Sequence, residues 1–140
     1  MSNPKNQYRI FVVDDEPMIA STLALILKQQ GFDVSSFTNP LKALEAVYIK
    51  ALDFLIADVI MPEMSGIDLA IVIREAFPSC TVLLFSGQIA TTELLESATR
   101  RGHDFEVLKK PVHPSEILAR VFSGLGLDSG SDESKDKSSS

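Results

Sequence analysis

The sequence has a single cysteine, Cys80, among its 140 residues. One cysteine forms neither an internal disulfide nor a cysteine-based metal site, and we interpret Cys80 as a small core residue at the start of a strand. No apolar run approaches the ~18 residues of a membrane-spanning helix. Residues 1–9 contain no apolar segment of the kind found in signal peptides. We therefore expect a soluble, cytoplasmic protein with no membrane partner.

Clustered positive charge is also missing. The 13 lysines and arginines are scattered along the chain against 19 acidic residues, which gives a net charge of −6 and an isoelectric point near 4.8. Because phosphate contacts need grouped lysines and arginines, this distribution argues against a nucleic-acid partner. Apolar residues make up 45% of the chain, which is enough for the core of one ordinary domain.

Two apolar patterns alternate along the chain. Short runs rich in β-branched and aromatic residues predict strands at 8–13, 32–37, 54–58, 80–86 and 105–109. Apolar residues at helical spacing predict helices at 17–31, 39–50, 66–77, 91–102 and 113–126. Strict alternation favours an α/β, doubly wound fold, in which a five-stranded parallel sheet carries five helices on its two faces. The more polar strand 32–37 is expected at an edge of this sheet.

The carboxyl ends of the predicted strands carry the functional prediction, because doubly wound sheets bind their ligands beyond these ends. Four of the strands bring acids, a hydroxyl and an amine to this rim: Asp14, Asp15, Glu16, Asp58, Ser86 and Lys110. Each has an ordinary explanation on its own, since acids favour helix N-termini and Asp or Ser is common in turns. Their shared position favours a functional site, because helix caps do not require a cation opposite a group of acids.

Clustered carboxylates repel one another and need a counter-charge. Mg²⁺, which binds carboxylate, carbonyl and water oxygens, meets this need. Once Mg²⁺ and Lys110 neutralise the group, one carboxylate can attack phosphorus and form an acyl phosphate. Ser86 can offer its hydroxyl to a phosphate oxygen. The break at Met61-Pro62 and Gly66, directly after the strand that ends at Asp58, leaves room for an incoming phosphodonor.

Four short motifs stand in order at the strand ends: "VVDDE" (12–16), "DVIMPEMSG" (58–66), "LLFSG" (83–87) and "KKP" (109–111). Together they resemble the receiver domain of two-component response regulators. The resemblance implies a flavodoxin-like sheet with strand order 2-1-3-4-5. We therefore divide the chain into an N-terminal extension (1–7), a receiver domain (8–124) and a low-complexity tail (125–140) that we expect to be disordered.

The resemblance also implies a role for the acids. Asp58 is the expected phosphoacceptor. Mg²⁺ is expected to bind Asp15, Asp58 and the backbone carbonyl of Ile60, and to bind Asp14 through water. Ile60 stands two positions beyond the acceptor, where many members of the family carry a polar side chain, so the lifetime of the acyl phosphate is left open. Gln88, two positions beyond Ser86, leaves it open for the same reason.

The remaining matched residues concern the switch. Ser86 is the expected switch hydroxyl. Lys110, which directly precedes the proline, is the expected active-site lysine rather than Lys109, and this Lys–Pro bond is usually cis in the family. The switch aromatic of the family lies three residues before the lysine, where this chain has Val107. Phe105, two residues earlier on the same strand face, is a candidate substitute.

The resemblance implies a phosphoacceptor signalling module in a phosphorelay, with a histidine kinase or phosphotransfer protein as the phosphate source. It is not expected to be an enzyme, beyond catalysing its own phosphorylation and dephosphorylation. No output domain follows the fifth predicted helix, so we expect action through an unknown downstream protein. Residues 91–102, 105–109 and 113–124 form the face that the family commonly uses for partners. A phosphate sink or shuttle is the alternative within the same class.

Two other classes of protein use related features. A haloacid-dehalogenase-type phosphatase also has an Asp nucleophile and Mg²⁺, but it needs two acids separated by one residue, whereas Asp14 and Asp15 are adjacent. A flavodoxin-like cofactor binder needs a phosphate loop after the first strand, where the acidic "DDEPM" would repel phosphate. His103 and His113 are interpreted as surface or capping residues and receive no catalytic role.

Overall fold

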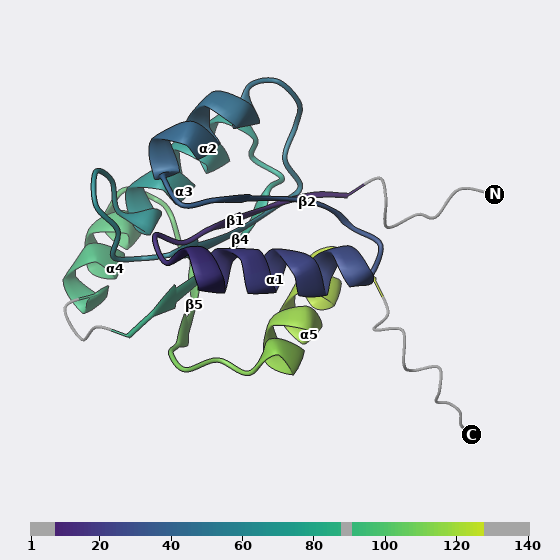
Figure 1. Ribbon diagram of the computed structural model, residues 1–140. Helices are drawn as coiled ribbons and strands as arrows, with labels where there is room; N and C mark the ends of the chain where they lie inside the picture. Colours follow the sequence, from purple (N-terminus) through teal and green to yellow (C-terminus); the bar gives the residue numbers. More distant parts are fainter. Residues whose placement is uncertain (1–7, 88–90, 128–140) are drawn as a thin grey trace.

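The computed structural model describes residues 8–87 and 91–127 (Figure 1). The expected N-terminal extension at 1–7, Gln88 and the tail from residue 128 lie outside the described residues. Within the described ranges the chain forms five strands, β1 (Arg9–Val13), β2 (Asp33–Phe37), β3 (Phe54–Asp58), β4 (Thr81–Ser86) and β5 (Glu106–Lys109). The helices are α1 (Pro17–Gln29), α2 (Pro40–Val47), α3 (Gly66–Ala76), α4 (Thr91–Arg100) and α5 (Pro114–Gly124).

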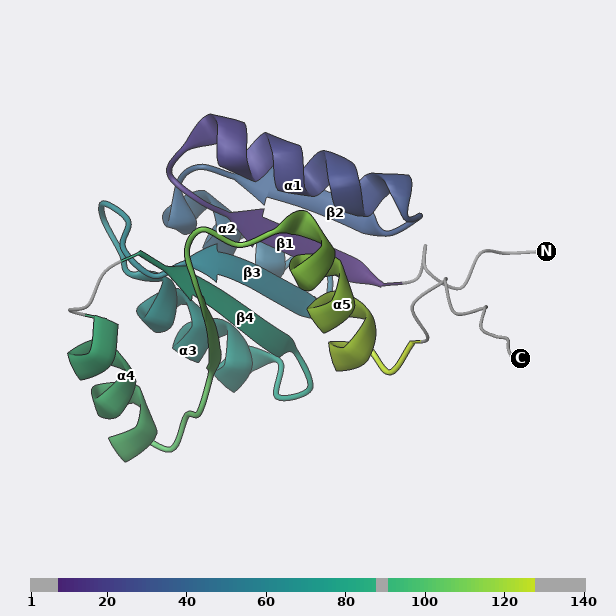
Figure 2. The same cartoon turned by 90° about the horizontal axis from the view of Figure 1, so that it is seen from below.

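The strands form one parallel sheet in the order β2-β1-β3-β4-β5. Helices α1 and α5 cover one face of this sheet, and α2, α3 and α4 cover the other (Figures 1 and 2). This arrangement confirms the predicted α/β, doubly wound, flavodoxin-like fold with strand order 2-1-3-4-5. All five strands therefore point their carboxyl ends at the same rim.

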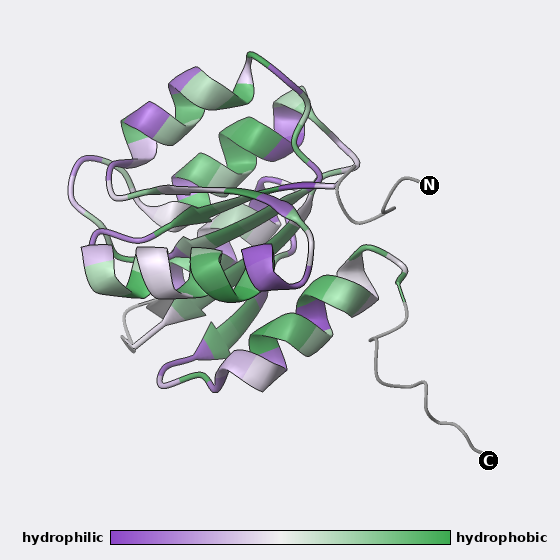
Figure 3. Ribbon diagram, turned by 45° about the vertical axis from the view of Figure 1, so that its right-hand side comes forward, coloured by the Kyte–Doolittle hydropathy of each residue, from purple (hydrophilic) through white to green (hydrophobic). Residues whose placement is uncertain are grey.

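Alternate residues of the central strands supply two separate cores. In β1, Phe11 faces the core under α2, α3 and α4, whereas Val12 faces the core under α1 and α5. Strand β3 is buried at every position, as expected for a strand covered on both faces. Strand β2 lies at an edge, as its polar sequence predicts, and only Val34 is fully buried there. Figure 3 shows hydrophobic strands between helices that carry both hydrophobic and hydrophilic residues.

Several helices begin with residues that favour a helix start. Pro17 and Pro40 open α1 and α2, and the Asn39 side chain accepts a hydrogen bond from the backbone N–H of Leu41. His113 caps α5 by accepting a hydrogen bond from the Ser115 N–H. None of the helices in the described ranges has the length and apolar character needed to cross a membrane.

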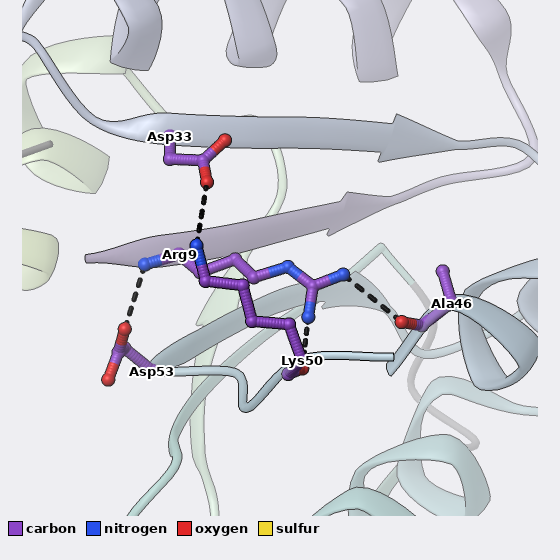
Figure 4. Close-up of polar contacts among 5 residues, drawn as sticks. All are labelled: Arg9, Asp33, Ala46, Lys50 and Asp53. Atoms are coloured by element: carbon purple, nitrogen blue, oxygen red, sulfur yellow. Dashed lines mark hydrogen bonds and ion pairs between the residues drawn. The ribbon is translucent and has the colours of Figure 1, made fainter. Parts of the chain in front are cut away.

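Helix α2 ends at Val47, whereas the periodicity predicted a helix over 39–50. Arg9 begins β1, at the opposite end of the sheet from the acidic rim, and contacts this end of α2 (Figure 4). Its guanidinium donates hydrogen bonds to the carbonyl oxygens of Ala46, at 3.1 Å, and Lys50. Its backbone N–H donates to Asp53 Oδ2 at 2.8 Å. Arg9 thus donates to two carbonyls at and beyond the end of α2, and it ties the α2–β3 connection to β1.

Packing at the other end of the chain continues past residue 124, the expected boundary of the domain. The backbone N–H of Leu125 donates to the Val121 carbonyl, and that of Leu127 donates to the Phe122 carbonyl. Both leucine side chains are half-buried against the core beneath α1 and α5. Residues 125–127, which we assigned to the tail, therefore pack with α5 as part of the domain.

Candidate functional site

The rim of the sheet brings the predicted acids together. Asp14 follows β1 and is fully buried, and its backbone N–H donates to the Phe37 carbonyl at 3.0 Å. Its Oδ1 accepts a hydrogen bond from the Glu16 N–H at 2.9 Å, which fixes the carboxylate in position. Asp58 is the last residue of β3 and is 7% exposed. Two buried carboxylates therefore end two adjacent strands.

Lys110 follows β5, the edge strand, and its side chain reaches this pair of acids. Its Nζ lies 3.1 Å from Asp58 Oδ2 and 3.6 Å from Asp14 Oδ2. Its backbone N–H donates to the Ser86 carbonyl at 2.9 Å, so the ends of β4 and β5 are tied together. The Lys110–Pro111 peptide bond is cis, which confirms the expectation. The adjacent Lys109 is the last residue of β5 and is exposed. Within the described part of the chain it forms no ion pair.

Burial and the neighbouring charges shift the pKa of all three groups. Desolvation raises the pKa of the Asp58 carboxyl above its usual value, although the hydrogen bond and charge of Lys110 oppose it. Desolvation also raises the pKa of Asp14, against the Glu16 N–H and the Lys110 charge. Burial lowers the pKa of Lys110, but the hydrogen bond to Asp58 and the Asp14 charge outweigh burial, so the net pKa is raised. The carboxyl groups of Asp14 and Asp58 are therefore harder to ionise than a solvated aspartate, even with Lys110 beside them.

The carboxylates have the arrangement of a cation site. Ligand oxygens of Asp14, Asp15 and Asp58 lie within 4.8 Å of one another. Asp14 Oδ2 is buried and has no hydrogen-bond donor in the described part of the chain, leaving only the 3.6 Å ion pair with Lys110. A buried, unsatisfied carboxylate oxygen is costly unless a cation or water contacts it. The oxygen-only donor set, with partly exposed Asp15 open to water, fits Mg²⁺.

The loop after Asp58 folds back tightly over its own strand. The Val59 N–H donates to the Phe85 carbonyl at 3.0 Å, and the Gly66 N–H donates to the Val59 carbonyl at 2.8 Å. A Cβ on Gly66 would lie 2.1 Å from the Asp58 carbonyl oxygen, so only glycine fits there. Glu63 has a positive φ of 67°, a strained value for a non-glycine residue. The sequence break at 61–66 is therefore a compact turn beside the rim, and the Ile60 side chain projects from it with 42% exposure.

The structure does not bring all of the predicted switch residues together. Ser86 is buried at the end of β4, and Val107 lies beside Leu84, two rows below it. Phe105 precedes β5, so it lies four residues below the Ser86 row, or about 13 Å along the strand. Its ring stacks on His103 at 5.8 Å and lies beneath the Arg74 guanidinium at 5.3 Å.

Sequence reasoning missed two partners of Lys110. The Phe85 ring lies 5.8 Å from its Nζ, and Gly87 lies beside its aliphatic stem. An apolar residue inside a strand, such as Phe85, gives no sign in the sequence of its neighbours across the sheet. Its position directly before Ser86 was the available signal, since that places it at the same rim.

A parallel sheet in the order 2-1-3-4-5, with three aspartates and a lysine at its carboxyl rim, defines a receiver-type α/β domain. The family model of the response regulator receiver domain matches residues 10–122. The chain belongs to this family, which sets aside the phosphatase and flavodoxin-like alternatives.

Similar proteins support the same assignment. The DNA-binding response regulator MtrA of Mycolicibacterium smegmatis is 32% identical over 117 residues, which cover 84% of this chain and 50% of that protein. A solved protein from Neptuniibacter caesariensis gives a TM-score of 0.78 at 32% identity, over 89% of this chain and 90% of that one. The BeF3-activated receiver domain of DrrB, a Thermotoga maritima response regulator, gives a TM-score of 0.73 at 28% identity, over 85% and 97%. The chain spans about half the length of the curated relatives it matches.

Proposed function

We propose that the chain is a phosphoacceptor module that is phosphorylated on Asp58 with Mg²⁺ and signals through contacts with other proteins. The observation that carries this proposal is the position of Lys110 Nζ, 3.1 Å from Asp58 and 3.6 Å from Asp14. An ammonium group between two buried carboxylates can balance the charge of an arriving phosphoryl group. The similarity to a receiver domain solved in a BeF3-activated form supports the same reading.

The chain's own residues supply most of the chemistry. An Asp58 carboxylate oxygen forms a bond to phosphorus while the bond from phosphorus to the donor's imidazole nitrogen or acyl oxygen breaks, and the leaving group keeps that electron pair. Lys110 pairs with the phosphoryl oxygens, and Ser86 donates its hydroxyl to one of them. Mg²⁺, held by Asp14 through water and by Asp15, Asp58 and the Ile60 carbonyl, would supply further positive charge at those oxygens.

We propose a histidine kinase or phosphotransfer protein as the donor. The receiver face around α4, β5 and α5 is the proposed contact surface for a downstream protein, and a phosphate sink or shuttle is the alternative use of the same chemistry. Relatives named as DNA-binding response regulators favour a second output, control of transcription. That output would need a part of those relatives that this chain does not cover.

Intact-protein mass spectrometry after incubation with acetyl phosphate and Mg²⁺ tests the acceptor. Wild type should gain one phosphoryl group, and Asp58→Asn should gain none. Asp68→Asn, which changes an exposed aspartate on α3, is the matched control and should behave as wild type. Phosphorylation of Asp58→Asn at the wild-type level would refute the proposal. Asp15→Ala should lose saturable Mg²⁺ binding and phosphorylation together.

A further inference from the structure

The side chain of Lys110 has to cross a strand to reach its partners. Lys110 follows β5, whereas Asp58 ends β3, and β4 lies between these two strands. The lysine stem therefore passes over the end of β4 before its Nζ arrives 3.1 Å from Asp58 Oδ2. A lysine stem is long and flexible, so it holds such a path only if neighbouring groups confine it.

Two residues at the end of β4 confine the stem. The Phe85 ring is 2% exposed, so its position is fixed, and its centroid lies 5.8 Å from Lys110 Nζ. A Cβ on Gly87 would lie 3.8 Å from Lys110 Cβ and 3.9 Å from Cδ, which shows how closely the stem passes the backbone there. Phe85 also pairs with Asp58 in the β3–β4 register. The backbone that carries the ring is therefore paired with the strand that carries the acid.

A cavity lies beside the Lys110 stem. Phe85 and Lys110 both line an apolar cavity of about 500 Å³, whose other walls include Met18 and Leu23 of α1 and Ile117 of α5. Without the ring, the lysine stem would have space to turn into this cavity and away from the rim. An aromatic face attracts an ammonium group, so the ring favours the path that ends at Asp58.

We propose that Phe85 is a positioning residue that holds the Lys110 ammonium between Asp14 and Asp58, with Gly87 leaving the space through which the lysine stem passes. The inference rests on the proposed phosphorylation of Asp58. Phe85 acts through Lys110 and touches no reacting atom, so its loss should slow phosphorylation without removing the acceptor.

The test compares Phe85→Leu and Phe85→Tyr with Phe54→Leu. Phe54 lies in the same core, but at the start of β3, remote from the rim, so Phe54→Leu controls for the loss of a buried ring. The initial rate of phosphorylation by acetyl phosphate with Mg²⁺ should fall about three- to tenfold in Phe85→Leu relative to Phe54→Leu. Phe85→Tyr keeps the ring face, so it should stay within about twofold of wild type.

A second readout separates positioning from a loss of packing. Protons held near an aromatic face are shifted upfield in NMR spectra, so the Lys110 side-chain signals should move in Phe85→Leu and stay in Phe85→Tyr and Phe54→Leu. Equal rates in Phe85→Leu and Phe54→Leu, or unmoved Lys110 signals, would overturn the inference while Asp58 phosphorylation stands. A wild-type protein that accepts no phosphate would overturn the proposed function itself.

Discussion

Gly66 occupies a position that no side chain can share. A Cβ there would lie 2.1 Å from the Asp58 carbonyl oxygen and 2.9 Å from its carbon, and both are backbone atoms that cannot rotate away. Gly66→Ala should therefore lower the free energy of unfolding by about 3 kcal/mol, near the upper end for overpacking. It should also slow phosphorylation, since the displaced backbone carries the acceptor. Urea unfolding and the acetyl phosphate assay measure the two effects.

Gly102→Ala is the comparison for Gly66→Ala. Gly102 has a φ of +91° and no atom within 4 Å of an added Cβ, so only backbone strain opposes alanine. We expect a loss of about 1 kcal/mol and a normal phosphorylation rate. Equal stability losses at the two glycines would mean that the close approach to Asp58 carries no special cost.

Asp14 should destabilise the metal-free protein at neutral pH. Burial raises the pKa of its carboxyl above the value of 3.8 in the unfolded chain. The folded state then binds more protons than the unfolded state between pH 3.8 and the raised pKa, so stability falls as pH rises through this window. Asp14→Asn should therefore unfold at higher urea concentration than wild type at pH 7 in EDTA, with no difference below pH 3.8.

Added Mg²⁺ provides the control for the Asp14 prediction. A cation that binds only the folded site stabilises wild type by mass action and leaves Asp14→Asn nearly unchanged. The gap between the two proteins should therefore close or reverse as Mg²⁺ increases. If Asp14→Asn is less stable than wild type in EDTA, the prediction is wrong, because Lys110 and the Glu16 N–H then compensate the Asp14 charge without a metal.

At the scale of elements, Arg9 holds the end of α2 against β1 through hydrogen bonds. Its guanidinium donates hydrogen bonds to the carbonyls of Ala46 and Lys50, and the Lys50 ammonium lies 3.8 Å from the Asp33 carboxylate of β2. Arg9→Ala should lower the free energy of unfolding by roughly 1–3 kcal/mol, because these carbonyls lose charged donors. Lys42→Ala, which breaks an exposed pair with Glu45 on α2, should cost less than about 0.5 kcal/mol. Chemical denaturation of both variants checks this difference.

The switch elements should respond unequally to phosphorylation. The Lys110 N–H donates a hydrogen bond to the Ser86 carbonyl, which joins the ends of β4 and β5. A phosphoryl group on Asp58 that attracts the Lys110 and Ser86 side chains should therefore move both strand ends. Val107 offers no ring to rotate beneath Ser86, and Phe105 is held by His103 and Arg74. We expect larger amide NMR shifts at Ser86, Gly87 and the start of α4 than in β5 when beryllofluoride is added.

Asp58→Asn is the control for the beryllofluoride experiment and should show none of these shifts. Shifts confined to residues that touch the mimic, with α4 unchanged, would contradict signalling through that face. Larger shifts in β5 than at Ser86 would mean that Val107 or Phe105 takes the part of the usual aromatic. Each result assigns the coupling to a different element.

At the scale of the whole molecule, charge predicts what the chain does not bind. The net charge is −6, and several arginines and lysines already pair with acids, as Arg120 does with Glu106 and Glu116. We expect no salt-dependent affinity of this 140-residue chain for random duplex DNA in fluorescence anisotropy at low salt. The phosphorylated chain, which carries more negative charge, should give the same result. Affinity that falls with added salt would contradict the expectation.

Local sequence determined the fold class and which residues lie at the carboxyl rim of the sheet. Strand and helix periods are visible within about ten residues, and β3 is apolar at every position before Asp58 because both of its faces are covered. In a parallel sheet all carboxyl ends share one edge, so Asp14, Asp58 and Lys110 could be placed together without any coordinates. The roles of these residues came from four motifs and their spacing, and the 2-1-3-4-5 strand order came from the same resemblance.

Only the tertiary structure decided the contacts made across strands. Asp58 and Lys110 are 52 positions apart, and Arg9 lies 37 positions from Ala46. Such pairs depend on strand order, register and the path of each side chain, none of which leaves a periodic trace in the sequence. The structure therefore placed Phe85 beside Lys110, held Phe105 away from Ser86 and ended α2 at Val47. Local pattern selects the elements, and packing over long sequence separation selects their neighbours.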